Sequence, residues 1–572
     1  MTGPLDPELT GQLDPIRLEV WWSRLAAIAD EAATALLRTA FSTIIRESND
    51  YTVVLMNPAG QTIAECRAGI PAFAVLMGVL TRHLLDRFPA GTWREGDVVI
   101  TNDPWLATGH LPDIAMVAPI FHQGALAGFA GTAAHVPDIG GTPTMGPTDL
   151  MAEGLLIPPL HLYRAGARSE AVVALLRGNV RLPVQVWGDL EAQLAAHDVC
   201  RRRVAEFFDD TGASGFGAIA DAVHAAADRA TRRAVAAVPD GVYRSVLDAD
   251  GVDGQPTHIE CAVTIDGERV AIDYTGTSPQ VAYPTNCTLN YTTAYSIYPL
   301  KILLDPATRS NHGCYRAITV TAPEGSILNS RFPAPVLARH LTGHLLSCAI
   351  YQALADVLPD RVIADSGGAP ALRVQFAGAA TPGGTPGERG DPFSLILFAS
   401  AGMGACAHHD GLSTTAFPTN SGSGSIEALE ASAPLIFQKK EFRADSGGAG
   451  THRGGLGQDI AVHHASQAPV RLALLGDRSR HPAQGVSGGL PGDAARAAYD
   501  SGASPSLKSV STLRDGDTIT ISFPGGGGYG PPGHRERAAI AADLAEGFVT
   551  HAAAVRDYGL GAVTQADPEQ GR

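Results

Sequence analysis

The chain has 572 residues, with 42 basic and 58 acidic side chains and a formal net charge of −16. This balance argues against nucleic acid or an anionic membrane as a partner, because both attract clustered cations. A chain of this length also exceeds what one hydrophobic core can organise, so we expect two or more lobes.

The N-terminal segment and the cysteines bear on the cellular environment. Residues 1–15 are acidic and contain prolines, and they lack the basic and apolar regions of a signal peptide. No stretch approaches the ~20 apolar residues that span a bilayer. The seven cysteines are scattered and never in Cys-x-x-Cys spacing, which fits neither a disulfide framework nor a zinc ribbon. We therefore expect a cytoplasmic protein whose cysteines are buried or incidental.

A long helix is expected near the start of the chain, over residues 16–46. Asp14-Pro15 is a typical helix opening, and no proline interrupts the segment that follows. Apolar residues recur at helical spacing: Leu18, Leu25, Ile28, Ala32, Ala35 and Leu36. Glu47 and Asp50 come at the end of this helix, just before a hairpin predicted at 52–65. An acidic residue at such a junction can reach into a site, although an ordinary loop carboxylate is the simpler interpretation.

A second β-hairpin is predicted from two apolar runs, residues 113–121 and 125–134, which flank a His-Gln-Gly turn at 122–124. The hairpin returns the chain to its starting point. His135 should therefore lie near Asp113.

The open end of this hairpin carries a candidate metal site. His110 and Asp113 are three positions apart, His135 follows 22 residues later, and Asp138 repeats the His-x-x-Asp step. Two imidazoles and a carboxylate suit a divalent ion such as zinc or manganese. The alternative is an ordinary hydrogen-bonded His–Asp pair, because the spacing matches no compact metal signature.

In the middle of the chain the sequence pattern changes from one typical of helices to one typical of β-strands. Residues 189–210 and 218–238 have the periodicity of amphipathic helices, and from residue 241 short runs alternate apolar and polar residues as half-buried strands do. A helix is expected at 340–357. Its His340 and His344 are four apart, a spacing that can bind zinc, but no third ligand is evident nearby.

The C-terminal third is rich in glycine and loops. Residues 375–392 have the composition of a linker. The glycine-rich runs at 446–457 and 524–530 lack the Gly-Lys-Ser/Thr of a phosphate-binding P-loop, so tight turns are the expected role. Asp445 and Arg453 are expected to order the first run through a charge pair.

Together these patterns predict an α+β fold with several lobes. We expect an N-terminal helix and β-hairpin lobe with the metal site (1–240), then a β-rich lobe with the helix 340–357 (241–375). A linker-like segment (376–392) should lead to a glycine-rich β lobe (393–533), which a C-terminal helix and tail follow (534–572).

Distinctive segments occur along the chain in a fixed order: TIIRESND (43–50), NDP (102–104), GHLPD (109–113), AHVPDIGG (134–141), EGLLIPPL (153–160), DYTGTSPQ (273–280), PAPV (333–336), FRADSGGAGTHRGGLG (442–457), PGGGGYGPP (524–532) and DLAEGFVTHAAAVRDYGL (543–560). With these motifs the chain resembles the hydantoinase B/oxoprolinase family. That family includes the B subunits of ATP-dependent hydantoinases, the matching half of 5-oxoprolinases, and subunits of acetone and acetophenone carboxylases.

The resemblance implies a ligand set for the metal. In metal-containing relatives, the matching positions are His110, Asp113 and His135, with an acidic residue from the early Arg-Glu-x-x-Asp segment. Asp50 is the expected fourth ligand and Glu47 its competitor. Asp138 would orient His135 or accept a proton from water, and Glu153 is a weaker candidate for acid/base work.

The resemblance also implies a partner and a reaction. ATP would be bound by a hydantoinase A-type ATPase subunit, and this chain would be the B subunit of an ATP-dependent cyclic amidohydrolase acting on a small cyclic amide. The stretch AGIPAFAV (68–75) departs from the family pattern, with Phe73 where a histidine is common, which suggests a more apolar substrate group. The alternatives are one subunit of an ATP-dependent ketone carboxylase, a non-catalytic scaffold for the ATPase, or a metallohydrolase that needs no ATP.

Overall fold

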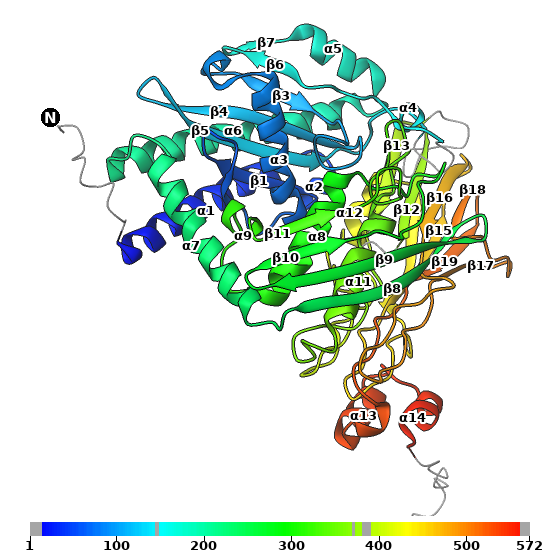
Figure 1. Cartoon of the computed structure of the whole chain (residues 1–572). Coiled ribbons are helices and arrows are strands. Elements are labelled where there is room, and N and C mark those ends of the chain that lie inside the picture. Colours follow the sequence, from blue (N-terminus) through cyan, green and yellow to red (C-terminus); the bar gives the residue numbers. More distant parts are fainter. Residues whose placement is uncertain (1–13, 143–147, 369–371, 380–389, 561–572) are drawn as a thin grey trace, which may run out of the picture.

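The structure is a computed structural model that describes residues 14–142, 148–368, 372–379 and 390–560. Within these ranges the chain forms four β-sheets with helices packed on them (Figure 1). Helices and mostly antiparallel sheets occur in the same chain without a regular alternation, which confirms the expected α+β class.

The first sheet has seven strands in the order β2-β1-β5-β4-β3-β6-β7, and neighbouring strands are antiparallel. They are β1 (Tyr51–Met56), β2 (Thr62–Glu65), β3 (Val98–Thr101), β4 (Asp113–His122), β5 (Ala125–His135), β6 (Leu160–Arg164) and β7 (Ala167–Arg168). Both hairpins expected from the sequence are confirmed. Short helix α4 (Leu150–Glu153) and helix α5 (Glu170–Asn179) adjoin this sheet.

Helices cover both faces of the first sheet. Helix α3 (Pro71–Arg87) packs on one face, and α1 (Pro15–Thr39) and α6 (Pro183–Thr211) pack on the other. This burial on both faces explains why β4 and β5 are apolar in continuous runs and do not alternate.

The first helix is shorter than the sequence predicted. Asp14 caps it with its side chain as expected, but α1 ends at Thr39, and a separate turn, α2 (Thr43–Arg46), follows. The backbone N–H groups of Phe41 and Ser42 donate to the Asp189 carboxylate of α6. This tertiary contact replaces the helical hydrogen bonds and redirects the chain toward Asp50.

The second sheet has the order β11-β10-β9-β8, with β8 (Gly241–Val252), β9 (Gln255–Asp266), β10 (Arg269–Asp273) and β11 (Ile318–Thr321). Around it lie α7 (Gly217–Ala236), α8 (Leu289–Leu304), α9 (His312–Tyr315), α10 (His340–Gly343) and α11 (Leu345–Leu354). The helix expected at 340–357 is thus divided into α10 and α11 at His344. The core of this sheet is continuous with the residues beneath α3, so the first two lobes share one hydrophobic core.

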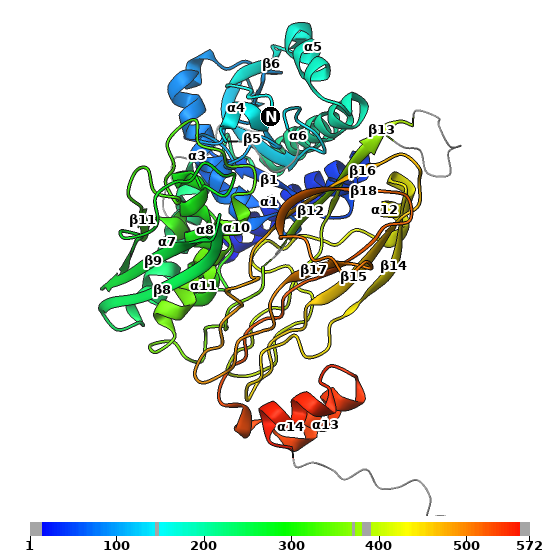
Figure 2. The same cartoon turned by 90° about the vertical axis from the view of Figure 1, so that its right-hand side faces the viewer.

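The third and fourth sheets form a β-sandwich (Figure 2). One has the order β13-β12-β16-β18 and the other β14-β15-β19-β17. Their strands are β12 (Leu372–Ala379), β13 (Pro392–Leu397), β14 (Leu435–Phe442), β15 (Gln458–His464), β16 (Val470–Gly476), β17 (Arg496–Tyr499), β18 (Lys508–Leu513) and β19 (Thr518–Ser522), and α12 (Ile426–Ser432) packs beside β14.

The segment with linker composition joins two neighbouring strands of one sheet. Strands β12 and β13 pair in antiparallel fashion, and the expected linker 376–392 begins inside β12. Residues 380–389 lie outside the described part of the chain. The lobe boundary predicted at 376–392 therefore falls between two paired strands of one sheet. All the lobe boundaries expected from the sequence remain predictions.

The C-terminal helices α13 (Arg537–Ala545) and α14 (His551–Tyr558) lie against the glycine-rich loops at one end of the sandwich. The expected Asp445–Arg453 pair is wrong: Arg453 pairs with Asp543 of α13, and Asp445 accepts hydrogen bonds from Thr550. The two glycine-rich runs bond to each other through their backbones. A Cβ atom at Gly454 would stand 2.0 Å from a carbonyl oxygen of the other run, so close packing requires glycine there.

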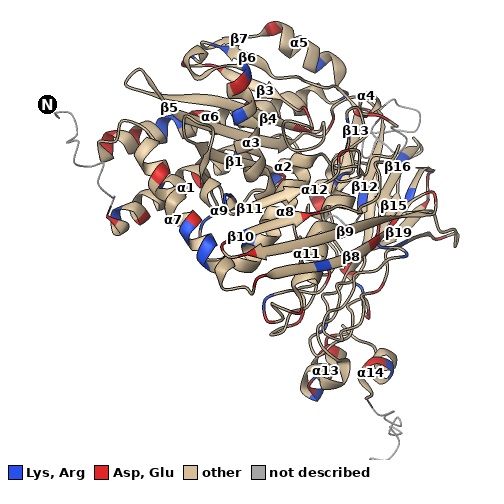
Figure 3. Ribbon diagram, in the orientation of Figure 1, with Lys and Arg blue, Asp and Glu red and all other residues tan. Residues whose placement is uncertain are grey.

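The distribution of charged residues and the burial of the cysteines agree with what the composition predicted (Figure 3). Figure 3 shows basic and acidic residues distributed together over several elements. All seven cysteines are free and buried. Across the described ranges, no helix combines the length and the apolar character needed to cross a bilayer.

Candidate metal centre and active site

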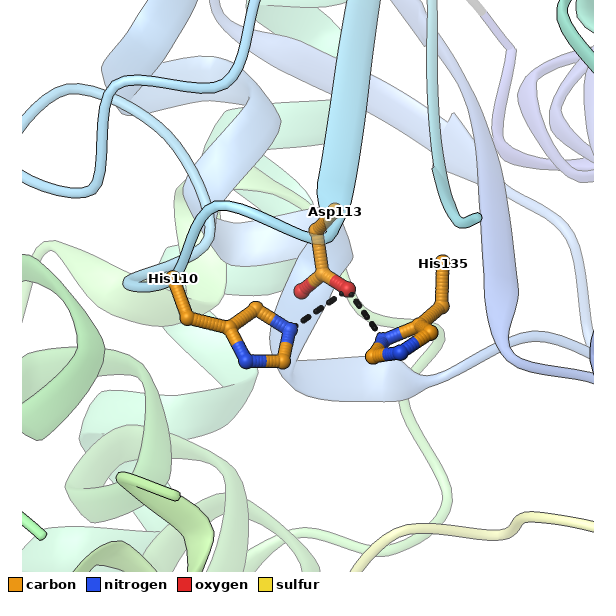
Figure 4. A group of neighbouring side chains, drawn as sticks. All are labelled: His110, Asp113 and His135. Carbon is orange, nitrogen blue, oxygen red and sulfur yellow. Dashed lines mark hydrogen bonds and ion pairs between the residues drawn. The ribbon is translucent and has the colours of Figure 1, made fainter. Parts of the chain in front are cut away.

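The long hairpin brings Asp113 and His135 together, as the sequence predicted. Asp113 begins β4, His135 ends β5, and the two residues are direct partners in the antiparallel register. His110 lies in the loop that leads into β4. The side chains of all three are buried and face one another (Figure 4).

The Asp113 carboxylate is the centre of this group. Its Oδ1 lies 2.8 Å from His110 Nε2 and 2.9 Å from His135 Nδ1. Ligand atoms of the three residues all lie within 4.8 Å of one another, close enough to share one ion. Asp50 Oδ2 lies 3.7 Å from His135 Nδ1, and Asp50 is at the edge of the same cavity.

The protonation of His110 makes this arrangement suited to a cation. Its Nδ1 lies 3.0 Å from the carbonyl oxygen of Leu337, so Nδ1 carries the proton and donates it. Burial, with help from the nearby Arg339, lowers the pKa of His110 to about 3, so the ring is neutral. A bare Nε2 lone pair then faces a carboxylate oxygen.

A divalent ion would relieve this repulsion between lone pairs. The Nε2 atom of His135 is also buried, with no hydrogen-bond partner. Buried polar atoms are seldom left unsatisfied in native proteins. The donor set of two imidazoles and a carboxylate therefore fits zinc or manganese.

The two carboxyl groups of the site differ in charge state. Burial alone would raise the pKa of Asp113, but His110, Arg339 and the imidazole hydrogen bonds hold it well below its ordinary value. Burial raises the pKa of Asp50 to about 6, against the opposing effect of His135. Asp113 is thus a permanent anion at neutral pH, and Asp50 is poised close to its titration range.

The site opens into a cavity with a polar and an apolar side. Its polar lining includes Tyr291, Tyr295, Arg339, His340, His344, Arg373, Thr419 and Ser421. The apolar side is formed by Ile70 just before α3, Phe73 of α3, and Ile396 and Phe398 at the end of β13. The sequence predicted a less polar pocket at Phe73, and this side chain does line the cavity. His340 and His344 lie in this same cavity, with ring centroids 5.7 Å apart.

The structure separates the remaining predicted residues from the cavity. Asp138 is ion-paired with Arg181, with 2.7 Å between Oδ1 and the guanidinium, and it accepts a hydrogen bond from Gly140. His135 donates its Nδ1 hydrogen bond to Asp113, which occupies the position that Asp138 was expected to fill. Of the two early acidic residues, Asp50 lines the cavity and Glu47 does not.

Glu153 is connected to the site through the backbone. Its Oε1 accepts hydrogen bonds from the N–H groups of Val336, at 2.6 Å, and Leu337, at 2.7 Å. The Leu337 carbonyl in turn binds His110. Glu153 therefore fixes the loop that orients His110, and these contacts favour a positioning role over acid/base chemistry.

Replacing Glu153 by glutamine should change how stability depends on pH. Burial raises the pKa of Glu153 to about 8, from an ordinary value of 4.5. Between these values the folded chain binds one more proton than the unfolded chain, so the unfolding free energy falls as pH rises. We expect Glu153→Gln to match the wild type near pH 5 and to exceed it at pH 9, by on the order of 3 kcal/mol. Melting temperatures across this range measure the effect, and parallel curves for the two proteins would contradict it.

Sequence reasoning missed several residues of the cavity. Arg339 donates to Asp113 Oδ2 at 2.8 Å, and its guanidinium lies 4.3 Å from the centre of the Tyr291 ring. A single arginine has no spacing that marks it. Tyr291 and Tyr295 are four residues apart on α8, and that helical spacing was a usable signal.

Comparisons with known proteins agree with the motifs. A family model described as Hydantoinase B/oxoprolinase matches residues 14–532. A protein from Pseudomonas sp. (strain NS671), provisionally named as the B subunit of a D-/L-hydantoinase, is 29% identical, with 98% of this chain and 96% of that protein covered. The beta subunit of caprolactamase from Pseudomonas jessenii is 28% identical, with 96% of each chain covered.

Solved structures share the fold. The crystal structure of the ATP-dependent caprolactamase from Pseudomonas jessenii matches with a TM-score of 0.89 and 27% identity, over 98% of both chains. The nucleotide-free structure of acetone carboxylase matches with a TM-score of 0.85 and 21% identity, over 97% of this chain and 80% of that one. At this lower identity the second match concerns the fold alone.

Proposed function

Because the chain belongs to the hydantoinase B/oxoprolinase family, we propose that it is the B (beta) subunit of an ATP-dependent cyclic amidohydrolase. An A-type ATPase subunit would phosphorylate the amide oxygen of a small cyclic amide, and this chain would complete the hydrolysis. The observation that carries the proposal is the buried group of His110, Asp113 and His135, in which the Nε2 atoms of both imidazoles have no hydrogen-bond partner among the described residues and all three residues line the cavity.

The residues of the site have distinct roles in this proposal. His110, Asp113 and His135 would hold a divalent metal, with Asp50 as the fourth ligand. When bound, such an ion supplies Lewis-acid polarisation and lowers the pKa of water toward ~7. Arg339 keeps Asp113 ionised and oriented through its hydrogen bond to Oδ2.

The apolar side of the cavity would bind the hydrocarbon part of the substrate. Phe73 and Phe398 are 4% and 8% exposed and contribute aromatic surface close to the ligand set. Packing against methylene groups of a ring would exclude bulk water from the reacting carbon. We assign a positioning role to Glu153, through the loop at Leu337, and a structural role outside the cavity to Asp138, which binds Arg181.

The apolar side also fits a second candidate, an ATP-dependent ketone carboxylase. A ketone offers the same kind of hydrocarbon surface as a lactam, and four apolar side chains line this side. The two reactions differ in their co-substrates. A carboxylase consumes bicarbonate with a ketone, and an amidohydrolase opens a ring without bicarbonate.

The decisive experiment assembles the full chain with its partner ATPase and measures ATP turnover. The candidate substrates are hydantoin, 5-oxoproline and caprolactam, and acetone and acetophenone with bicarbonate. We expect ATP-dependent ring opening of a cyclic amide, and about one metal ion per chain that His135→Ala loses. Bicarbonate-dependent turnover with a ketone would support the carboxylase. Turnover that His135→Ala leaves unchanged would indicate a scaffold.

A further inference from the structure

Strand β12 contributes a cation to the active-site cavity. Its residues alternate between two faces: Leu372, Val374 and Phe376 belong to the core of the sandwich, and Arg373 points to the opposite face. On that face it lines the cavity together with His110, Asp113 and His135. The β-sandwich thus supplies a charged side chain to a site whose ligands come from the first sheet.

Arg373 is buried and has no partner in the described part of the chain. Its residue exposure is 6%. Its guanidinium makes no hydrogen bond or ion pair within the described ranges, and its Nε is a buried donor without an acceptor. Two other buried arginines differ in this respect: Arg339 is paired with Asp113, and Arg478 lies 3.7 Å from Asp365.

An unpaired buried cation is costly. Removing an ion from water costs several kcal/mol unless a counter-charge and hydrogen bonds compensate. Burial and the like charge of Arg339 lower the pKa of Arg373 to about 10, against the opposing effect of the Asp113, Glu153 and Asp50 carboxylates. At this pKa the guanidinium is still protonated at neutral pH. The cavity therefore contains a cation with free donors, and no carboxylate of the described residues lies within ion-pair distance of it.

We propose that Arg373 forms an oxyanion-binding subsite, in which its guanidinium holds anionic oxygens of the substrate. The proposal deepens the proposed function and rests on it, because the bound group is taken to be part of the activated substrate. Planar guanidinium groups bind phosphate and carboxylate oxygens in a bidentate manner. The anion is either the phosphoryl group of the activated amide or a carboxylate carried by the substrate.

This subsite gives the cavity two recognition elements. The apolar side at Phe73 and Phe398 accepts the hydrocarbon part of the substrate, and Arg373 accepts its anionic part. The two elements together orient the substrate against the ligand set. They select an amphipathic anion over a neutral ring of the same size.

The test measures binding of inorganic phosphate and of acetate to the metal-loaded full chain without its partner. Isothermal titration calorimetry would compare the wild type with Arg373→Met and Arg373→Lys. The control is Arg471→Met, because Arg471 is exposed on the neighbouring strand β16. Metal content is measured for each protein, so that a lost ion is not mistaken for a lost subsite.

We expect Arg373→Met to weaken anion binding at least tenfold, Arg373→Lys to weaken it less, and Arg471→Met to leave it unchanged. Phosphate should raise the melting temperature of the wild type and leave that of Arg373→Met unchanged, which also shows that the variant is folded. Binding of phosphate alone identifies a phosphoryl subsite, and binding of acetate identifies a carboxylate subsite. Equal affinity in wild type and Arg373→Met, or no binding to the wild type, would overturn the proposal.

These results are independent of the test of function. If the assembled complex opens no cyclic amide but anion binding still depends on Arg373, the proposed reaction fails and the subsite remains. If ring opening occurs and Arg373→Met binds phosphate and acetate as the wild type does, the subsite fails and the reaction remains.

Discussion

Asp113→Asn is expected to abolish metal binding and to reduce ATP-dependent turnover by at least about 1000-fold. The substitution keeps the size of the side chain but removes the charge on which His110, His135 and Arg339 converge. The amide introduced at this position would be neutral, and its one oxygen could face either the imidazoles or Arg339, so that the amide nitrogen would meet the other partner without accepting a hydrogen bond or ligating an ion. Elemental mass spectrometry and turnover in the assembled complex measure the two losses.

The matched control is Asp138→Asn. This carboxylate is also buried and follows the same hairpin, but it is bound to Arg181 outside the cavity lining. We expect Asp138→Asn to keep its metal and most of its turnover. If Asp138→Asn lost turnover as Asp113→Asn does, while keeping the metal, Asp138 would have the catalytic role that its motif suggested.

Arg535→Met is expected to destabilise the attachment of the C-terminal helices by about 3–5 kcal/mol. Arg535 is 3% exposed in its side chain and binds both Asp410 oxygens at 2.7 Å, as well as Asp543 of α13 at 2.7 Å. Removing it leaves two carboxylates without their main counter-charge. Hydrogen exchange over 537–558 should accelerate, and limited proteolysis should cleave there first.

Arg556→Met is the control for this effect. Arg556 pairs with Asp557 on the surface of α14, where its side chain is 67% exposed. A pair of this kind contributes between about 0 and 1 kcal/mol. Unchanged exchange in Arg535→Met would mean that the glycine-rich loops alone hold the helices in place.

The function of the glycine-rich loops also follows from these contacts. His408, His409 and Asp410 are adjacent residues of types that can bind metals, but Asp410 accepts hydrogen bonds from Arg535 and from the Arg453 backbone. Arg453 and Arg535 both contact Asp410, and both also pair with Asp543 of α13, so these contacts connect the glycine-rich loops to α13. Asp410 thus has a structural role, and the metal chemistry proposed for this chain remains at the hairpin.

The sequence by itself determined the features that depend on local spacing. A two-stranded hairpin with a short turn has one register, so the positions of Asp113 and His135 follow from the pattern of apolar residues. The Asp14 cap and the helices α6 and α7 follow in the same way from short-range rules. The order of the distinctive motifs along the chain also identified the hydantoinase B/oxoprolinase family from the sequence alone.

Only the tertiary structure decided what surrounds the ligands. Arg339 precedes α10, Arg373 belongs to β12 and Phe398 follows β13, so the cavity closes only when three separate parts of the chain pack together. The partners of Asp138 and Glu153 are likewise distant residues whose contacts leave no periodic trace in the sequence. Spacing predicts contacts along one element or one hairpin, whereas charge pairing across a core depends on how sheets and helices pack.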